Sequence, residues 1–90
     1  MKTIWKYNLE VVDDQLLEIP IEAEILDVQM QYGSPQLWAV VTPELQKETR
    51  HIRIHGTGHR VSTVDNLKYI STFQMEGGSL VFHAFEVVSE

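Results

Sequence analysis

Hydrophobic and polar residues alternate with a period of two along much of this chain, which indicates β-strands with one buried face. The first run covers residues 5–11 and predicts a half-buried antiparallel strand. Asp13 and Asp14 predict a turn after it, because their side chains bond to nearby backbone. A short strand over residues 16–19 follows and ends at Pro20, since proline cannot donate to a strand ladder.

The next two runs predict a β-hairpin. Residues 26–32 alternate, and the four apolar side chains from Leu26 to Tyr32 are expected on one face. Gly-Ser-Pro at residues 33–35 is expected to turn the chain. Residues 36–41 are apolar on both faces, so this strand is expected at the centre of a sheet or beneath a second layer. Within it, Trp38 either packs in that layer or anchors an interface.

The second half of the chain continues this pattern of short strands separated by turns. Around Arg53, Ile52 and Ile54 are expected to face inward, and the polar neighbours outward. The expected segments are a polar loop over 42–48 with room for one helical turn, a strand over 51–55, a loop or short helix over 61–68, and a second hairpin with strands over 69–75 and 80–88.

These segments predict a mainly β fold, a small antiparallel sandwich or barrel of about seven short strands with at most one short helix. Residues 1–90 are expected to form a single domain, since domains run from ~50 to ~250 residues. A chain this short buries a thin core, and association with further copies is one way to add buried area. The protein is therefore expected to form a homo-oligomer.

Composition limits the cellular locations and the classes of binding partner that are expected for this protein. The chain has no cysteine and a net charge of −6, which disfavours a disulfide framework, a generic nucleic-acid surface and binding to anionic membranes. No stretch approaches the ~20 apolar residues of a membrane span, so the cytoplasm is the expected location. The positive charge is concentrated between Arg50 and Arg60, where an anion can meet it locally.

The most distinctive feature is the corner formed by Gly56, Thr57 and Gly58 at the end of a predicted strand. Glycines allow close approach to backbone N–H groups, arginines bind phosphate with paired hydrogen bonds, and histidines donate or stack. A strand-ending bulge that needs glycine for its geometry is the simpler account, and the sequence leaves both open. The candidate ligand-binding residues are Arg53, His55, Gly56, Thr57, Gly58, His59, Arg60 and Trp38.

No catalytic, metal or cofactor site is expected. His51, His55 and His59 recur every four residues, but on a strand that step is ~13 Å at ~3.3 Å per residue. Ligands of one zinc ion lie only ~3–4 Å apart, which leaves His55 and His59 across the turn as the one open pair. No serine occupies a Gly-x-Ser-x-Gly elbow. His83, inside an apolar run, is expected to be a hydrogen-bonded core residue.

Six short motifs occur in order along nearly the whole chain: Trp5-Lys6-Tyr7, Ala23-Glu24-Ile25-Leu26, Leu37-Trp38-Ala39, Gly56-Thr57-Gly58-His59, Tyr69-Ile70-Ser71-Thr72-Phe73-Gln74 and Val81-Phe82-His83-Ala84-Phe85. With these motifs the chain resembles a family of small phage and prophage proteins that carries no established activity. The pattern of that family has glycine before the Ala-x-Ile-Leu segment. Here the position is Glu22, so the turn is expected to differ.

The resemblance implies a protein that acts by binding in the cytoplasm of an infected bacterium. One expectation is an anti-defence protein that sequesters a small phosphorylated, nucleotide-type immune signal at the 53–60 corner. Two alternatives remain, which are an inhibitor of a host protein and a minor phage structural or assembly protein. The inhibitor would use the acidic residues Asp13, Asp14, Glu18 and Glu24.

Overall fold

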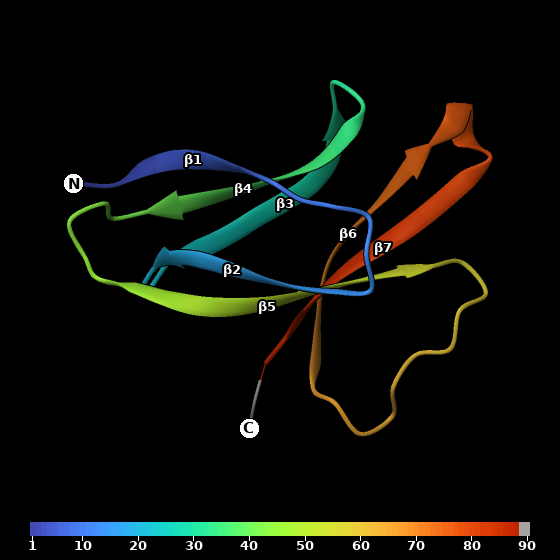
Figure 1. Cartoon of the computed structure of the whole chain (residues 1–90). Helices are drawn as coiled ribbons and strands as arrows, with labels where there is room; N and C mark the ends of the chain where they lie inside the picture. The colour runs from blue at the N-terminus through green and yellow to red at the C-terminus, as the bar shows by residue number, and fades with distance from the viewer. Residues whose placement is uncertain (89–90) are drawn as a thin grey trace.

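A computed structural model describes residues 1–88, and in that range it contains seven strands and one 3-10 turn (Figure 1). The elements are β1 (Thr3–Asn8), β2 (Asp14–Pro20), β3 (Glu24–Gln31), β4 (Ser34–Val41), β5 (Lys47–Gly56), β6 (Leu67–Met75), η1 (Glu76–Gly78) and β7 (Leu80–Val87). They form two antiparallel sheets, one ordered β1-β4-β3 and the other β2-β5-β7-β6. The predicted mainly β fold is confirmed, and the arrangement is not a closed barrel.

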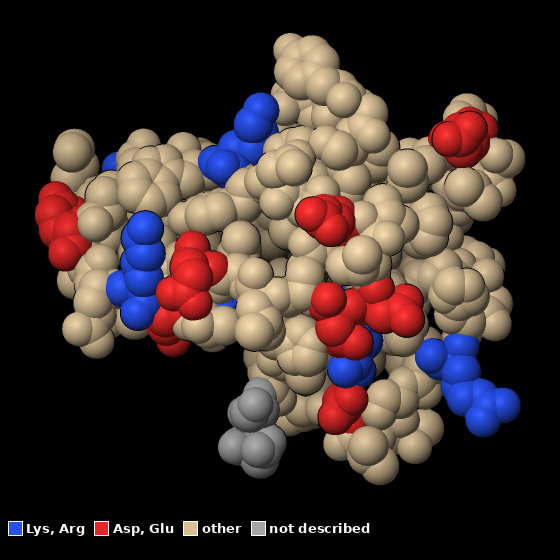
Figure 2. Space-filling model, viewed as in Figure 1, with Lys and Arg blue, Asp and Glu red and all other residues tan. Residues whose placement is uncertain are grey.

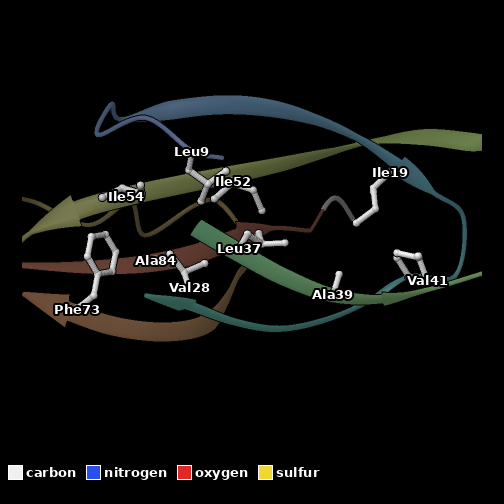
Figure 3. Packing of buried hydrophobic residues seen from close by; sticks show 11 residues of the cluster. Leu9, Ile19, Val28, Leu37, Ala39, Val41, Ile52, Ile54, Phe73 and Ala84 are labelled. Atoms are coloured by element: carbon white, nitrogen blue, oxygen red, sulfur yellow. The ribbon is translucent and has the colours of Figure 1, made fainter. Parts of the chain in front are cut away.

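Apolar side chains from both sheets meet in one core (Figure 3). Ile52 and Ile54 face inward as predicted, and β4 lies at the centre of its sheet. The shortest dimension of the molecule is 15 Å, which suits two sheets at ~10 Å spacing. The buried apolar residues are Leu9, Ile19, Ala23, Val28, Leu37, Ala39, Val41, Ile52, Ile54, Phe73 and Ala84.

Several predicted boundaries shift. The first strand ends at Asn8 and Val11 is exposed, because the chain leaves the sheet after Leu9 to cross to β2. Asp14 already belongs to β2, and β5 begins at Lys47. Residues 61–68, for which the sequence predicts either a loop or a short helix, are irregular up to residue 66 and then enter β6. No helix within residues 1–88 is long and apolar enough to span a membrane.

The first hairpin turns one residue earlier than predicted. Tyr32 and Gly33 form its turn, with φ angles of 53° and 84°. Two consecutive positive φ values are typical of the type I′ turn, whose twist matches that of the strands it joins. Tyr32 is therefore exposed at the tip instead of sharing the buried face.

A bulge in β3 also alters the predicted buried face. The register with β4 shifts between Ile25 and Asp27, which leaves Leu26 exposed as the extra residue. Ile25 and Val28 both face the core as a result, although three positions separate them. The expectation that Leu26 and Val28 share a face was wrong, because a bulge inserts one residue into the alternation.

The two sheets meet where β3 approaches β6, and Ser71 joins them. A second bulge between Tyr69 and Ser71 in β6 lies at this seam. The buried Ser71 hydroxyl donates to the carbonyl of Val28 at 2.6 Å and accepts from the N–H of Val28 at 3.1 Å. One side chain thus takes the place of a strand-to-strand hydrogen-bond pair between the sheet edges.

An ion pair closes one end of the core. The Arg50 guanidinium binds both carboxylate oxygens of the buried Glu86 and donates to the carbonyl of Ala23 at 3.0 Å. The hydrogen bond to Glu86 raises the pKa of Arg50 above its usual value. Arg50 therefore serves the fold, although in the sequence it belongs to the basic middle of the chain.

The turn between β2 and β3 contains Glu22, the position at which the resemblance leads one to expect glycine. Glu22 has a φ of 68°, and the N–H of Ala23 bonds to the carbonyl of Pro20 across the turn at 3.3 Å. Glycine adopts this left-handed backbone conformation most readily, because it has no Cβ to clash with the backbone. Glu22 holds this left-handed conformation at a cost in free energy.

We predict that Ser71→Ala lowers the free energy of unfolding by about 2 kcal/mol, because the buried carbonyl of Val28 loses its partner and the N–H of Val28 keeps only the carboxylate of Asp27. Urea denaturation followed by circular dichroism measures this change. Ser79→Ala is the control, since Ser79 bonds only the exposed turn carbonyl of Glu76. Equal stability of the two variants would contradict the role of the seam.

We predict that Glu22→Gly raises the free energy of unfolding by about 0.5–1 kcal/mol, because glycine adopts a positive φ without strain. The matched control is Glu24→Gly in the extended strand β3, which should lower it by a similar amount. Thermal melts of both variants give the comparison. Destabilisation by Glu22→Gly would show that the turn is not strained.

Candidate functional site

An open pocket of about 640 Å³ lies between the outer face of β5, the residues around the start of β2 and the segment that follows β5. In Figure 1 this segment is the long loop that extends beyond the end of β5. Residues 57–66 form it and are called the pocket loop. The lining residues are Asp13, Asp14, Arg53, His55, His59, Arg60, Val61, Ser62, Thr63 and Val64. The fold therefore brings four of the predicted site residues, Arg53, His55, His59 and Arg60, to one cavity.

The glycine corner is a turn closed by its own hydrogen bonds. The N–H of Gly56 donates to Nδ1 of His59 at 3.1 Å, and the N–H of His59 returns to the carbonyl of Gly56 at 3.0 Å. The N–H of Thr57 donates to the carbonyl of Val81 at 3.1 Å. A Cβ at position 56 would lie 3.0 Å from the His59 ring, and Gly58 has a φ of 93°. These N–H groups are engaged, so an anion would meet side chains rather than a backbone cradle.

Thr57 and His83 anchor this corner to the sheet. The Thr57 hydroxyl donates to the carbonyl of Val81 at 3.2 Å, so Nε2 of His83, 2.8 Å away, must donate to Thr57. Nδ1 of the neutral ring then accepts from Thr72 at 3.0 Å, and Tyr69 bonds Thr72 at 2.8 Å. His83 is hydrogen-bonded as predicted, but it lies half-buried on the outer face, because the inward position belongs to Ala84.

Arg53 clamps the pocket loop to the sheet. Its Nε donates to Asp14 at 2.7 Å and its Nη1 donates to Asp65 at 2.8 Å. His51 contacts the same Asp14 oxygen through Nε2 at 2.6 Å. The hydrogen bond from Arg53 lowers the pKa of Asp14 and of Asp65 below the usual value of 3.8. Figure 2 shows acidic groups gathered around a basic group below the centre of the visible face.

Sequence reasoning did not assign a role to Asp65, and it treated Asp14 as a turn residue and as part of the acidic face of the inhibitor alternative. Asp65 lies 12 positions after Arg53, and Asp14 lies 39 positions before it. Only the pairing of β2 with β5, which sets Asp14 opposite Arg53, brings these charges together. Alternation along β5 was the one available signal, since it placed Arg53 on the outer face.

The remaining polar groups of the pocket form fewer hydrogen bonds and ion pairs. The exposed Arg60 side chain makes no ion pair or hydrogen bond with residues 1–88. Nε2 of His55 is buried without a partner in that range, and its ring packs edge-on against Phe85 at 5.9 Å. Within the described part of the chain, no group of three or more acidic or histidine side chains is arranged to hold a metal ion.

Trp38 lies apart from the other candidate residues. It is half-buried on the outer face of the other sheet, where it is paired with Lys6 of β1 and Asp27 of β3. Its chain neighbours Leu37 and Ala39 face the opposite way, into the core. The fold therefore does not bring Trp38 to the pocket.

Two sheets joined at a seam, with an open polar pocket beside a clamped loop, define a small β-protein. The family model for DUF7352, a domain of unknown function, matches residues 1–90, so the chain belongs to this family. A search of curated proteins found no match. A search of solved structures also found none.

We predict that the pocket loop is released as the pH falls below 3.8. A carboxyl whose pKa is depressed by folding stabilises the fold above its unfolded pKa, and this contribution is lost as the pH falls through the folded pKa. The heteronuclear NOE of the Val64 amide measures release of the loop.

Asp65→Asn should produce the same release at neutral pH, because it removes the charge that holds the loop to Arg53. Asp13→Asn removes a neighbouring charge that forms no ion pair within residues 1–88 and should leave the NOE unchanged. A rigid loop in Asp65→Asn would show that the clamp does not hold it.

Proposed function

We propose that this DUF7352 protein is a non-catalytic binding protein that holds a small phosphorylated, nucleotide-type ligand in the pocket beside the pocket loop. One observation carries the proposal. Arg60, without a side-chain partner in residues 1–88, lines a pocket whose other polar side chains include His59, Ser62 and Thr63. A charged group left without a partner in a polar cavity favours an anionic ligand that completes it.

The distribution of groups around the pocket favours a ligand with two chemically different parts. Arg60 and His59 offer donors to a phosphate, and arginine binds phosphate through paired hydrogen bonds. The carboxylates of Asp13 and Asp14 offer acceptors to ribose hydroxyl or base amino groups. Val64 is 90% exposed on the loop and offers an apolar contact to a base.

The resemblance to phage and prophage proteins suggests the biological setting. A protein of this kind that binds without catalysis would act in the cytoplasm of an infected bacterium and sequester a nucleotide-type immune signal. Inhibition of a host protein is the alternative. Its acidic face is less available than the sequence indicates, because Arg53 binds Asp14 and Thr49 binds Glu18.

Isothermal titration with cyclic dinucleotides and ADP-ribose derivatives tests the proposal. We predict that one of them binds, and that Arg60→Ala weakens this binding about ten- to a hundredfold, as expected for one charge-assisted hydrogen-bonding group. Lys47→Ala, which removes an exposed positive charge outside the pocket, should leave the affinity unchanged.

A second variant acts through the loop. Asp65 binds Nη1 of Arg53 and holds the pocket loop, so Asp65→Asn releases the loop that carries His59 and Arg60 and should weaken binding. Replacing Arg53 and Arg60 together by alanine should abolish it. If no compound of these classes binds, or if the double variant binds as the wild type does, the proposed function is wrong.

A further inference from the structure

The edges of the two sheets differ in how they are protected. Edge strands expose unpaired N–H and C=O groups, and proteins normally cover or guard them. The β3 and β6 edges face one another at the Ser71 seam. The β2 edge carries Asp14 and Glu18 and ends at Pro20, which are features that discourage pairing. This leaves β1, which within residues 1–88 pairs with β4 alone.

Nothing along β1 guards its free edge. The strand contains no proline and no acidic residue, and it keeps a single register with β4. Its one charged side chain, Lys6, lies back across the sheet, where Nζ bonds Gln31 at 2.7 Å and sits 5.9 Å from the centre of the Tyr32 ring. Ile4 and Trp5 are 58% and 36% exposed, so neither side chain is covered within residues 1–88 of one copy of the chain.

The direction of the backbone groups along β1 identifies which residues can pair outward. The N–H of Leu9 donates to the carbonyl of Pro35 in β4 at 2.9 Å. Residues that direct their backbone groups toward a partner alternate along an antiparallel strand. Odd-numbered residues of β1 therefore face β4, and the N–H and C=O groups of Ile4 and Lys6 point out from the free edge.

We propose that a second copy of this chain pairs with the free edge of β1 in antiparallel orientation, about a two-fold axis at Trp5. In this register Ile4 of one copy exchanges hydrogen bonds with Lys6 of the other, and the two Trp5 residues form the close, non-hydrogen-bonded pair at the axis. The three-stranded sheets of the two copies then join into one continuous sheet. The core-facing sides remain continuous, because a two-fold axis perpendicular to the sheet keeps each face on its own side.

Charge selects this register over its neighbour. A shift that centres the axis on Lys6 would set the two Lys6 residues directly opposite each other, and like charges in that position destabilise a strand pair. Centring on Trp5 sets Lys6 opposite Ile4 and stacks two aromatic rings, which are favourable cross-strand pairs. A positively charged strand is also the least repulsive approach between copies that each carry a net charge of −6.

Cysteine cross-linking tests the register. The chain has no cysteine, so Trp5→Cys introduces a single thiol, and directly opposed non-hydrogen-bonded positions at ~4.5 Å between Cα atoms allow a disulfide. We expect Trp5→Cys to form a disulfide-linked dimer under mild oxidation. Ile4→Cys and Leu16→Cys, at exposed positions that do not face themselves, should cross-link far less. Equal cross-linking of all three variants would overturn the proposal.

Association of unmodified chains gives the second test. Sedimentation equilibrium of the wild type should approach twice the 10.4 kDa mass of the chain as concentration rises. Trp5→Glu and Trp5→Lys should each weaken self-association by about tenfold or more, because like charges then face across the axis. Mixing these two variants should restore a one-to-one heterodimer in native mass spectrometry. Leu16→Glu on the β2 edge should associate as the wild type does.

Two results would overturn the inference. A wild-type protein that remains monomeric at all concentrations excludes the dimer, and a mixture of the two Trp5 variants that forms no heterodimer excludes this register. Circular dichroism of each variant shows whether the fold is intact. The inference does not depend on the proposed ligand, because β1 contributes no residue to the pocket.

Discussion

The contact of Ser71 with Val28 is the interaction on which the two-sheet arrangement depends. A single hydroxyl donates to one backbone group and accepts from another, and it does so where bulges in β3 and β6 have interrupted the regular ladders. A bulge bends a strand and leaves backbone groups without a ladder partner. The buried hydroxyl bonds the N–H and C=O of Val28 at the β3 edge, so the sheets can meet edge to edge and enclose one core without closing into a barrel.

Because the sheets are joined along β3 and β6, their other two edge strands stay free in the described part of the chain. With β3 and β6 occupied, β1 and β2 become the outer edges, and only β2 carries proline and carboxylates. A molecule whose shortest dimension is 15 Å has a small core. One copy of the chain can therefore bury only part of its apolar surface. The exposed Ile4 and Trp5 on β1 are consistent with that limit.

At the pocket, structural and candidate binding roles divide among residues that look alike in the sequence. Arg50 closes the core with Glu86, Arg53 clamps the loop through Asp14 and Asp65, and Arg60 remains free of side-chain partners within residues 1–88. Gly56 and Gly58 shape a self-contained turn. The His59 ring packs closely on Gly56, and a side chain at that position would block this packing. The polar lining of the pocket beside this turn consists of side chains.

Local patterns determined most of the fold, because alternation and turn residues act over a few positions. The strands, the central place of β4 and the inward direction of Ile52 and Ile54 all follow from the sequence. The bulge at Leu26 was not predictable in this way, since the inserted residue interrupts the period-two alternation and is visible only in the register with β4. The partners of Arg53 and His83, and the separation of Trp38 from the pocket, were decided only by tertiary structure. These depend on which strands lie side by side, and that choice rests on long-range packing and hydrogen bonding that short-range alternation does not encode.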